Sequence, residues 1–320
     1  MIPRIRIAHL PTPIEPLPRL SAVLGGPQLW VKRDDQTGLA LGGNKTRKLE
    51  FVMAEAQAHG AQTLITVGAV QSNHCRQTAA LAARFGLKCT LVLFGDVPQT
   101  PSGNYLLDRL FGAEVVWTKR EDYEEVLQDV FHKAWSEGKR PFLIPLGAST
   151  ATGAVAYAYA FKEFIEQGGE ADWMVLASSS AGTQAGLVLG ARLSGWHGRI
   201  LGISVDHPAD WVKARVAELA TQAAERLGKA IHVSADEIDV NDEYIGAGYG
   251  VLGEREIEAI HLFARHEGLL LDPVYTTGRA AAGLIDLIRR GFFKSNDRIL
   301  FWHTGGVPAL FAERYAPYLL

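Results

Sequence analysis

The sequence predicts an α/β protein with open, mostly parallel, twisted sheets that are covered by helices on both faces. Short apolar runs alternate with amphipathic helical patterns along almost the whole chain, which is typical of parallel strands joined by crossover helices. A glycine also follows soon after each of the first helical patterns, as expected where helices end. With 320 residues, of which 48% are hydrophobic, the chain can bury the core of one large domain or two moderate ones.

In the first half of the chain, the predicted elements alternate after a proline-rich start. The prolines within residues 1–26 favour an extended arm or short turns. Strands are predicted at residues 29–33, 63–67, 89–94, 114–117 and 142–144. Helices are predicted at residues 45–58, 73–85, 102–111 and 121–137.

The second half continues the same alternation. Helices are predicted at residues 151–166, 183–193, 209–227, 254–266 and 277–290. Strands are predicted at residues 173–177, 200–205 and 298–302. Open sheets of this kind bind ligands beyond the carboxyl ends of their strands, so the loops that leave the strands are the places to look for a site.

Composition narrows the class of protein. A net charge of −3 argues against a protein that binds nucleic acid or an anionic membrane surface, because such proteins carry an excess of positive charge. Two cysteines cannot form a disulfide scaffold, and no apolar stretch reaches the length of a membrane span. The first residues carry no signal-peptide pattern. We therefore expect a cytoplasmic protein that binds neither nucleic acid nor a membrane.

Residues 42–50 read GGNKTRKLE and begin a predicted helix. The two glycines free the backbone, Asn44 is a residue type that caps helices, and an apolar stripe follows from Leu49. Lys45 is therefore expected at a helix N-terminus, whose positive end lowers the pKa of an amine from about 10.4 towards a nucleophilic neutral form. Taken alone, an ordinary loop lysine is the simpler interpretation, and two further stretches change that balance.

The first of these stretches, residues 178–183, reads SSSAGT and lies between a predicted buried strand and a helix. Small residues let backbone N–H groups converge at the positive end of the helix, and the hydroxyls of Ser180 and Thr183 add donors. A serine-rich solvated turn is the alternative, but the position favours a phosphate site.

The second stretch, residues 71–74, reads QSNH and begins a helix after the strand at residues 63–67. Ser72 suits the N-cap position, which explains one of these polar residues. The cluster of Ser72, Asn73 and His74 suits a carboxylate or a cofactor hydroxyl. Cys75 does not face His74, because adjacent helical residues point about 100° apart, and we interpret it as a packed thiol.

Two further segments lie near strand ends or helix starts. Residues 301–306 (FWHTGG) end a predicted strand and include Thr304, and residues 271–278 contain Tyr275. Tyr249 lies between two glycines. As single residues, both tyrosines are better interpreted as core aromatics with a hydroxyl at the surface.

Other chemistries lack their sequence patterns. Residues 38–45 miss the Walker spacing, because Asn44 separates the last glycine from Lys45. The histidines and cysteines show no metal-ligand spacing, so no metal site is predicted. Residues 202–206 lack the second glycine of a hydrolase nucleophile elbow.

Taken together, these stretches resemble the pyridoxal-phosphate (PLP) enzymes of fold type II, the tryptophan-synthase-β type. They are most similar to the D-cysteine desulfhydrase and 1-aminocyclopropane-1-carboxylate (ACC) deaminase family, which includes L-cysteate sulfo-lyases. The similarity runs from PTP at 11–13 and VKRDD at 31–35 through GGNK at 42–45 to HTGG at 303–306. It implies two sheets, a large PLP-binding domain of residues 1–47 and 151–320, a small α/β domain of residues 48–150, and a homodimer.

The resemblance also implies roles for individual residues. It implies that Lys45 forms the Schiff base with PLP, that Asn44 also binds the cofactor, and that Lys45, Ser72 and Tyr275 are catalytic. It implies that Asn73 bonds the 3-hydroxyl of PLP and that Thr304 faces its pyridine nitrogen. The phosphate is expected on Ser180, Ala181, Gly182 and Thr183, and the amino-acid substrate on Ser72, Asn73, His74, Tyr249 and Tyr275. Ser179 departs from the family pattern, which has glycine there, and the segment at 276–278 is one residue longer.

The reaction that the resemblance implies is α,β-elimination from a cysteine-like amino acid, of the D-cysteine desulfhydrase type, giving pyruvate, ammonia and sulfide. Open alternatives are an L-cysteate sulfo-lyase, an ACC deaminase, a β-replacement synthase and a non-catalytic PLP or amino-acid binder. Thr276 and Thr304 stand where the deaminases have Glu and Leu. A neutral hydroxyl near the pyridine nitrogen makes a weaker electron sink than a carboxylate, which favours elimination over ring opening.

Overall fold

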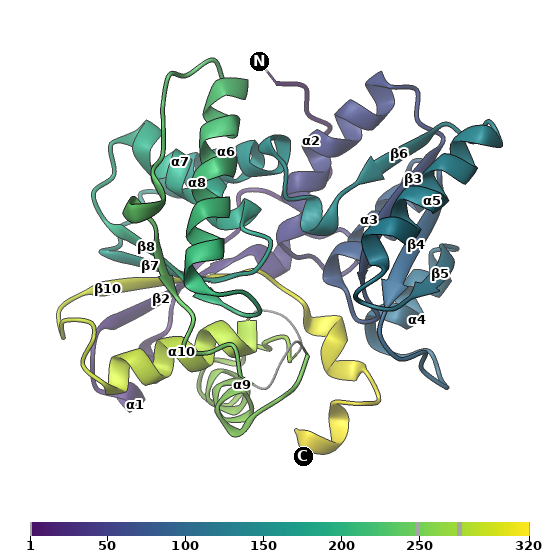
Figure 1. Ribbon diagram of the computed structural model, residues 1–320. Helices are drawn as coiled ribbons and strands as arrows, with labels where there is room; N and C mark the ends of the chain where they lie inside the picture. Colours follow the sequence, from purple (N-terminus) through teal and green to yellow (C-terminus); the bar gives the residue numbers. More distant parts are fainter. Residues whose placement is uncertain (1, 247–249, 274–276, 320) are drawn as a thin grey trace.

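The computed structural model describes residues 2–246, 250–273 and 277–319, and these form two sheets that are each covered by helices on both faces (Figure 1). The strand order is β1-β2-β10-β7-β8-β9 in the larger sheet and β5-β4-β3-β6 in the smaller. β1 pairs with β2 antiparallel, and the other pairings of described strands are parallel. The predicted fold class, an α/β protein with two mostly parallel sheets, is confirmed.

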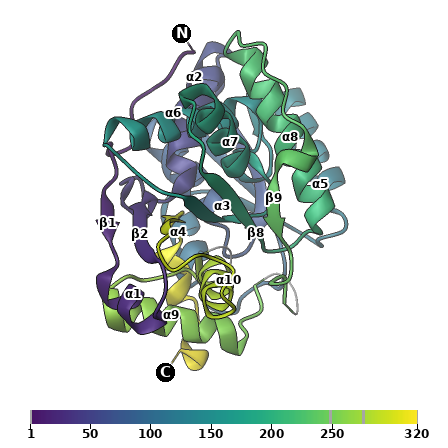
Figure 2. The same cartoon turned by 90° about the vertical axis from the view of Figure 1, so that its left-hand side faces the viewer.

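The larger sheet lies between two layers of helices (Figures 1 and 2). Its strands are β1 (Ile14–Pro16), β2 (Gln28–Arg33), β7 (Trp173–Ser178), β8 (Arg199–Ser204), β9 (Asp239–Asn241) and β10 (Arg298–His303). One face packs on α6 (Ala151–Glu166), α7 (Gly182–Ser194) and α8 (Ala209–Arg226). The other packs on α1 (Pro18–Leu24), α9 (Glu254–Glu267) and α10 (Thr277–Arg289).

The smaller sheet has the same layered design. Its strands are β3 (Thr63–Ala69), β4 (Lys88–Phe94), β5 (Glu114–Thr118) and β6 (Pro141–Ile144). One face packs on α2 (Asn44–Ala58), α3 (Asn73–Arg84) and α4 (Gly103–Leu110), and the other on α5 (Tyr123–Ser136). Successive residues of β3 point to opposite faces, so Leu64 enters the first core and Ile65 the second.

Helix α2 connects the two halves of the molecule. Its Leu49 and Met53 belong to the core of the smaller sheet, whereas Phe51 packs with α6 and α8 of the larger half. A helix that is buried on both sides holds its first turn firmly in place. Lys45 lies in that first turn.

The predicted strands and helices are all present, with ends that differ by at most two residues. The expectation for residues 1–26 was incomplete, because they include strand β1 and helix α1 as well as turns. Pro18 stands at the first position of α1, where a proline costs no hydrogen bond. The short strand β9 was also not predicted, and the domain limits near residues 48 and 150 stay a prediction.

Short 3₁₀ helices complete the described chain, at Asp34–Gln36, Leu146–Ala148, Ala235–Glu237, Val307–Phe311 and Ala316–Tyr318. None of the helices in the described ranges is long and apolar enough to cross a membrane.

Candidate active site

Loops from both halves of the molecule meet around one cavity that is partly open to solvent. Most of the site residues predicted from the sequence line it, namely Asn44, Lys45, Asn73, His74, Ser180, Ala181, Gly182, Thr183 and Thr304. Ser72 is fully buried behind this lining and caps α3, with its Oγ accepting a hydrogen bond from the Cys75 backbone N–H at 3.2 Å. Tyr249 and Tyr275, like Thr276, lie outside the described residues.

The start of α2 places Lys45 in the cavity. Gly43, with φ of 125°, is the N-cap, and Asn44 is the first helical residue rather than the cap. The Asn44 side chain is therefore available for other contacts: its Oδ1 accepts a hydrogen bond from Lys45 Nζ at 2.9 Å. Its Nδ2 donates to Thr183 Oγ1 at 3.1 Å, which ties the start of α2 to the start of α7.

Burial lowers the pKa of the Lys45 amine to about 8. The carboxylate of Asp272 opposes this effect and the guanidinium of Arg76 adds to it. The sequence predicted the direction of this shift from the helix end, whereas removal of the amine from water is the main cause in the structure. An amine with this pKa is partly neutral near neutral pH and so available as a nucleophile or base.

The loop before α7 forms an anion cradle. Ala181 adopts a left-handed conformation (φ 67°), which turns successive backbone N–H groups in one direction. Gly182 has no space for a side chain, since an added Cβ would lie 2.8 Å from Ser149 Oγ and 3.0 Å from Lys48 Nζ. Ser180 Oγ and Ser149 Oγ are 2.7 Å apart. This cradle has the shape and the donors that a phosphate group needs.

Lys48 is a second buried amine at the same cradle. Its Nζ donates to the Gly147 carbonyl at 3.1 Å and lies 3.4 Å from Ser149 Oγ. Burial, and then the neighbouring Lys45, hold the pKa of Lys48 well below its usual value. The two amines and the serine hydroxyls around the cradle can donate hydrogen bonds to an anionic ligand.

The start of α3 forms the wall opposite the cradle. Asn73 Nδ2 donates to Asp272 Oδ2 at 2.6 Å, and His74 Nε2 lies 2.8 Å from Thr66 Oγ1. Burial, and then the charges of Lys45 and Lys48, keep the pKa of His74 well below its usual value, so its ring is neutral. The Nδ1 atom of His74 is buried without a hydrogen-bond partner in the described part of the chain.

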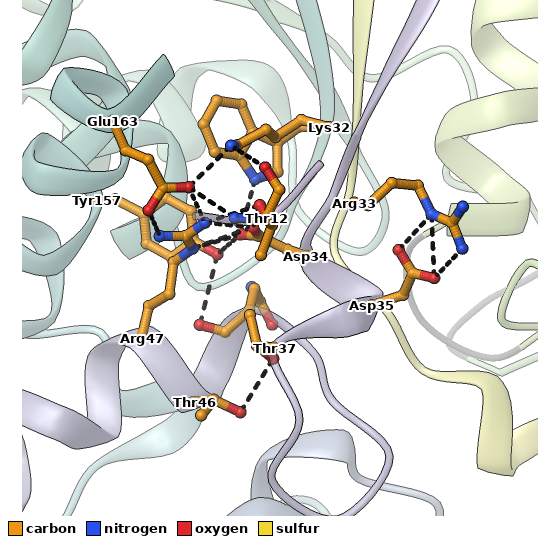
Figure 3. Close-up of polar contacts among 12 residues, drawn as sticks. Thr12, Lys32, Arg33, Asp34, Asp35, Thr37, Thr46, Arg47, Tyr157 and Glu163 are labelled. Carbon is orange, nitrogen blue, oxygen red and sulfur yellow. Dashed lines mark hydrogen bonds and ion pairs between the residues drawn. The ribbon is translucent and has the colours of Figure 1, made fainter. Parts of the chain in front are cut away.

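The side of α2 away from the cavity is fixed by a buried ion network, which we call the anchor cluster: Lys32, Asp34, Arg47, Tyr157 and Glu163 (Figure 3). Arg47 Nη2 lies 2.8 Å from both Asp34 Oδ1 and Glu163 Oε1, and Lys32 Nζ lies 2.8 Å from Glu163 Oε1. Tyr157 donates to Asp34 Oδ2 at 2.6 Å. Because Arg47 follows Lys45 by two residues, this cluster holds the backbone that carries the cavity amine.

Several residues of the site were missed or undervalued by sequence reasoning. Lys48 could have been found, since residues three apart share a helix face. Asp272, Ser149 and Arg76 gave no comparable signal, because their contacts depend on distant parts of the chain. Ser179, the departure from the family pattern, donates from Oγ to Asp206 Oδ2 at 2.9 Å and so packs beside the cradle. No group of three or more His, Cys, Asp or Glu side chains among the described residues is arranged to hold a metal ion.

Comparisons with known proteins identify the family and relatives of this chain. The family model for pyridoxal-phosphate dependent enzymes matches residues 5–305. D-cysteine desulfhydrase of Salmonella choleraesuis (strain SC-B67) is 44% identical over 326 residues, which cover 99% of this chain and 97% of the relative. D-cysteine desulfhydrase of Salmonella typhi is 43% identical with the same coverage.

Two solved structures have related folds. The crystal structure of an ACC deaminase homologue has a TM-score of 0.91 and 36% sequence identity, covering 99% of this chain and 95% of that one. O-ureido-L-serine synthase has a TM-score of 0.67 and 15% identity, covering 93% and 90% of the two chains. At that identity the second structure supports the fold alone.

Proposed function

Because this chain belongs to the family of pyridoxal-phosphate-dependent enzymes, we propose that it is a lyase that removes the β-substituent of a cysteine-like amino acid. D-Cysteine is the proposed substrate, and pyruvate, ammonia and sulfide are the proposed products. Full-length similarity to proteins named D-cysteine desulfhydrase supports this choice. The observation that carries the proposal is the Lys45 amine, with its pKa lowered to about 8, in the same cavity as an anion cradle.

The residues present fit the cofactor of this family. PLP has an aldehyde that reacts with an amine and a phosphate that needs a cradle. Lys45 supplies the amine. At Gly182, Ser149 and Lys48 lie too close for any side chain, so the backbone N–H groups there can face a phosphate. We assign the phosphate to residues 180–183, the 3-hydroxyl to Asn73 and the pyridine nitrogen to Thr304.

When bound, PLP supplies an electron sink for the negative charge that develops at the substrate Cα. The chain supplies proton transfer and orientation. Lys45 Nζ takes the Cα proton, and a positioned general base contributes on the order of 10²–10⁴ in rate. The positive N-terminus of α3, which Ser72 caps, is the proposed seat of the substrate carboxylate, together with Asn73 and the neutral ring of His74. The proposed substrate-side roles of Tyr249 and Tyr275 rest on the sequence resemblance.

ACC deamination is the second candidate function, because the ACC deaminase homologue is similar over almost the whole chain. Thr304, which directly precedes the glycine pair at 305–306, is buried in the cavity lining and carries no charge. We therefore expect efficient β-elimination and little ring opening.

A side-by-side assay of the purified enzyme tests this choice. Pyruvate is measured from D-cysteine, L-cysteine, L-cysteate and β-chloroalanine, and 2-oxobutyrate from ACC, with sulfide and sulfite as further products. We expect pyruvate with sulfide from D-cysteine. Efficient 2-oxobutyrate formation, or pyruvate with sulfite from L-cysteate alone, would overturn the substrate assignment. A new amino acid after addition of a second nucleophile would indicate a β-replacement synthase, and a yellow protein without turnover a cofactor binder.

We also propose a homodimer, as the sequence resemblance implies, that works in the cytoplasm, as the composition predicts. Light scattering of the holoenzyme should give about twice the 34.8 kDa of one chain. A mass of one chain at working concentration would contradict the dimer.

A further inference from the structure

A buried row of polar side chains lies behind the cavity wall, in the order Arg76, Asn73, Asp272. Asn73 Nδ2 donates to Asp272 Oδ2 at 2.6 Å. On the other end of the same amide, Asn73 Oδ1 accepts from Asn104 Nδ2 at 2.8 Å and from Arg76 Nη1 at 3.4 Å. The amide of Asn73 therefore has its donor end towards a carboxylate and its acceptor end towards a guanidinium.

This arrangement is fixed from all sides. Asp272, Arg76 and Asn104 have no exposed surface. Arg76 also donates to the Gly42 carbonyl at 2.6 Å, in the loop that leads to Lys45. Gly306 is a second constraint, because an added Cβ there would collide with the Asp272 carboxylate. A buried charge on each side of a residue that lines the cavity makes this row a candidate for function.

Both charges act on the Lys45 amine, and in opposite directions. The carboxylate of Asp272 favours its ammonium form and the guanidinium of Arg76 disfavours it. The other charged or titratable groups around the cavity are Lys48 on the same helix, His74 on α3, Arg120 after β5 and Asp206 after β8. Among these four, Asp206 is the only carboxylate, and its Oδ2 already accepts a hydrogen bond from Ser179 Oγ at 2.9 Å. The carboxylate that acts on the Lys45 amine is that of Asp272.

We propose that Asp272 is a positioning residue with two tasks: it fixes the amide of Asn73, and it stabilises the ammonium form of Lys45 once that amine has taken the substrate proton. The step is a proton transfer, in which the Cα–H bond breaks, its electron pair stays with the substrate, and the proton goes to Lys45 Nζ. In a buried cavity an ammonium group without a counter-charge is strongly disfavoured. The guanidinium of Arg76 disfavours the ammonium form and so opposes the effect of Asp272, which lets Lys45 return to its neutral form. The role of Asp272 during the proton transfer rests on the proposed function. The opposing effects of Asp272 and Arg76 on the charge state of Lys45 do not.

The test uses the full chain freed of cofactor, so that its result does not depend on any substrate. Trace acetic anhydride labels neutral amines, and mass spectrometry of the peptide gives the labelled fraction of Lys45, separate from Lys48, at a series of pH values. Asp272→Asn removes the charge but keeps an oxygen that accepts from Asn73. We expect it to lower the midpoint of Lys45 labelling by on the order of one pH unit.

Asn104→Ala is the matched control, because it removes a neutral hydrogen-bond partner of both Asn73 and Arg76 and leaves both charges. We expect its labelling midpoint to match the wild type, while its affinity for PLP falls. In the holoenzyme, Asp272→Asn should lower kcat for D-cysteine more than it raises KM. An unchanged midpoint in Asp272→Asn, or an equal shift in Asn104→Ala, would overturn the proposal.

Arg76→Met supplies an independent arm if Asp272→Asn does not fold, as judged by circular dichroism. Removal of the guanidinium should raise the labelling midpoint of Lys45, and a fall or no change would overturn the charge balance. Failure of the proposed function is distinguishable, since it would appear as wild-type enzyme that forms no pyruvate from D-cysteine while the labelling midpoints still differ as expected.

Discussion

Two charged regions lie on opposite sides of the first turns of α2, and they are built in opposite ways. In the anchor cluster, two cations (Lys32 and Arg47) face two carboxylates (Asp34 and Glu163) at 2.8 Å. In the cavity, the amines of Lys45 and Lys48 lie close together, and burial lowers the pKa of both. The cavity also contains polar atoms without a partner in the described residues, such as His74 Nδ1 and Ser178 Oγ.

The difference shows that a buried charged cluster can serve either structure or ligand binding in this protein, depending on whether its charges are paired. A balanced, fully bonded cluster holds backbone in place and leaves nothing for a ligand to bind. An unbalanced cluster lowers the pKa of its amines and leaves polar atoms for a ligand to satisfy. Helix α2 carries both, so the first region fixes the position of the second.

The largest expected effect comes from the cavity side. Lys45→Ala should abolish turnover, with a loss of at least about 10²–10⁴ in rate, because it removes the proposed general base and the point of cofactor attachment. Pyruvate formation measures the loss, and circular dichroism should show an unchanged fold. Turnover near the wild-type rate would mean that another group carries the reaction.

The next effect breaks the anchor cluster. Arg47→Ala leaves Asp34 buried without its cation and should reduce the free energy of unfolding by about 3–5 kcal/mol. Lys162→Ala, which breaks an exposed ion pair with Glu166 on α6, should cost about 0–1 kcal/mol. Urea unfolding of both variants measures the difference. Equal losses would contradict the structural role assigned to the anchor cluster.

A smaller effect is expected at the cradle. Ser180→Ala and Thr183→Val each remove one hydroxyl from the proposed phosphate site, where a hydrogen bond to a charged group contributes about 1.5–3 kcal/mol. PLP affinity should fall about tenfold or more in each, with catalysis retained at saturating cofactor. Fluorescence titration gives the Kd. Wild-type affinity in both variants would place the phosphate elsewhere.

The smallest expected effects are changes in the free energy of unfolding with pH, which differ between the anchor cluster and the cavity. Burial opposes the charge of Asp34, but Arg47 outweighs it, so the pKa of Asp34 lies below its usual value. Its contribution is therefore present above about pH 3.9 and is lost as the pH falls through the folded-state pKa. For Lys45, with a pKa lowered to about 8, the unfolded chain binds more protons between pH 8 and 10.5, so stability rises across that window.

Urea unfolding of the cofactor-free chain across pH measures both slopes. Asp34→Asn should flatten the acid limb, and Lys45→Met should reduce the rise between pH 8 and 10.5. Identical curves for wild type and both variants would show that neither group is perturbed as described.

Sequence patterns predicted the fold and much of the cavity because both depend on local order along the chain. Alternating strands and helices give the sheets, and Lys45, Asn73 and Thr183 each lie at a helix start that the pattern places beyond a strand end or loop. The contacts that join these starts are not local. Asn73 and Asp272 are 199 residues apart, and Asn44 and Thr183 are 139 apart.

The anchor cluster illustrates the same limit. The run VKRDD at residues 31–35 was part of the family resemblance, but its charges were predicted to lie at the end of a strand and before a loop. In the structure Lys32 and Asp34 have no exposed surface. Each forms an ion pair with a residue from a helix, Lys32 with Glu163 and Asp34 with Arg47. No spacing within the run indicates those partners.

The measurement that tests the central claim most directly is the chemical location of the cofactor. The holoenzyme is reduced with borohydride, digested, and searched by mass spectrometry for the lysine that carries the pyridoxyl group. We expect the group on Lys45 and none on Lys48, the other amine in the cavity. A label on Lys48, or on any lysine outside the cavity, would contradict the assignment of Lys45 and with it the proposed reaction.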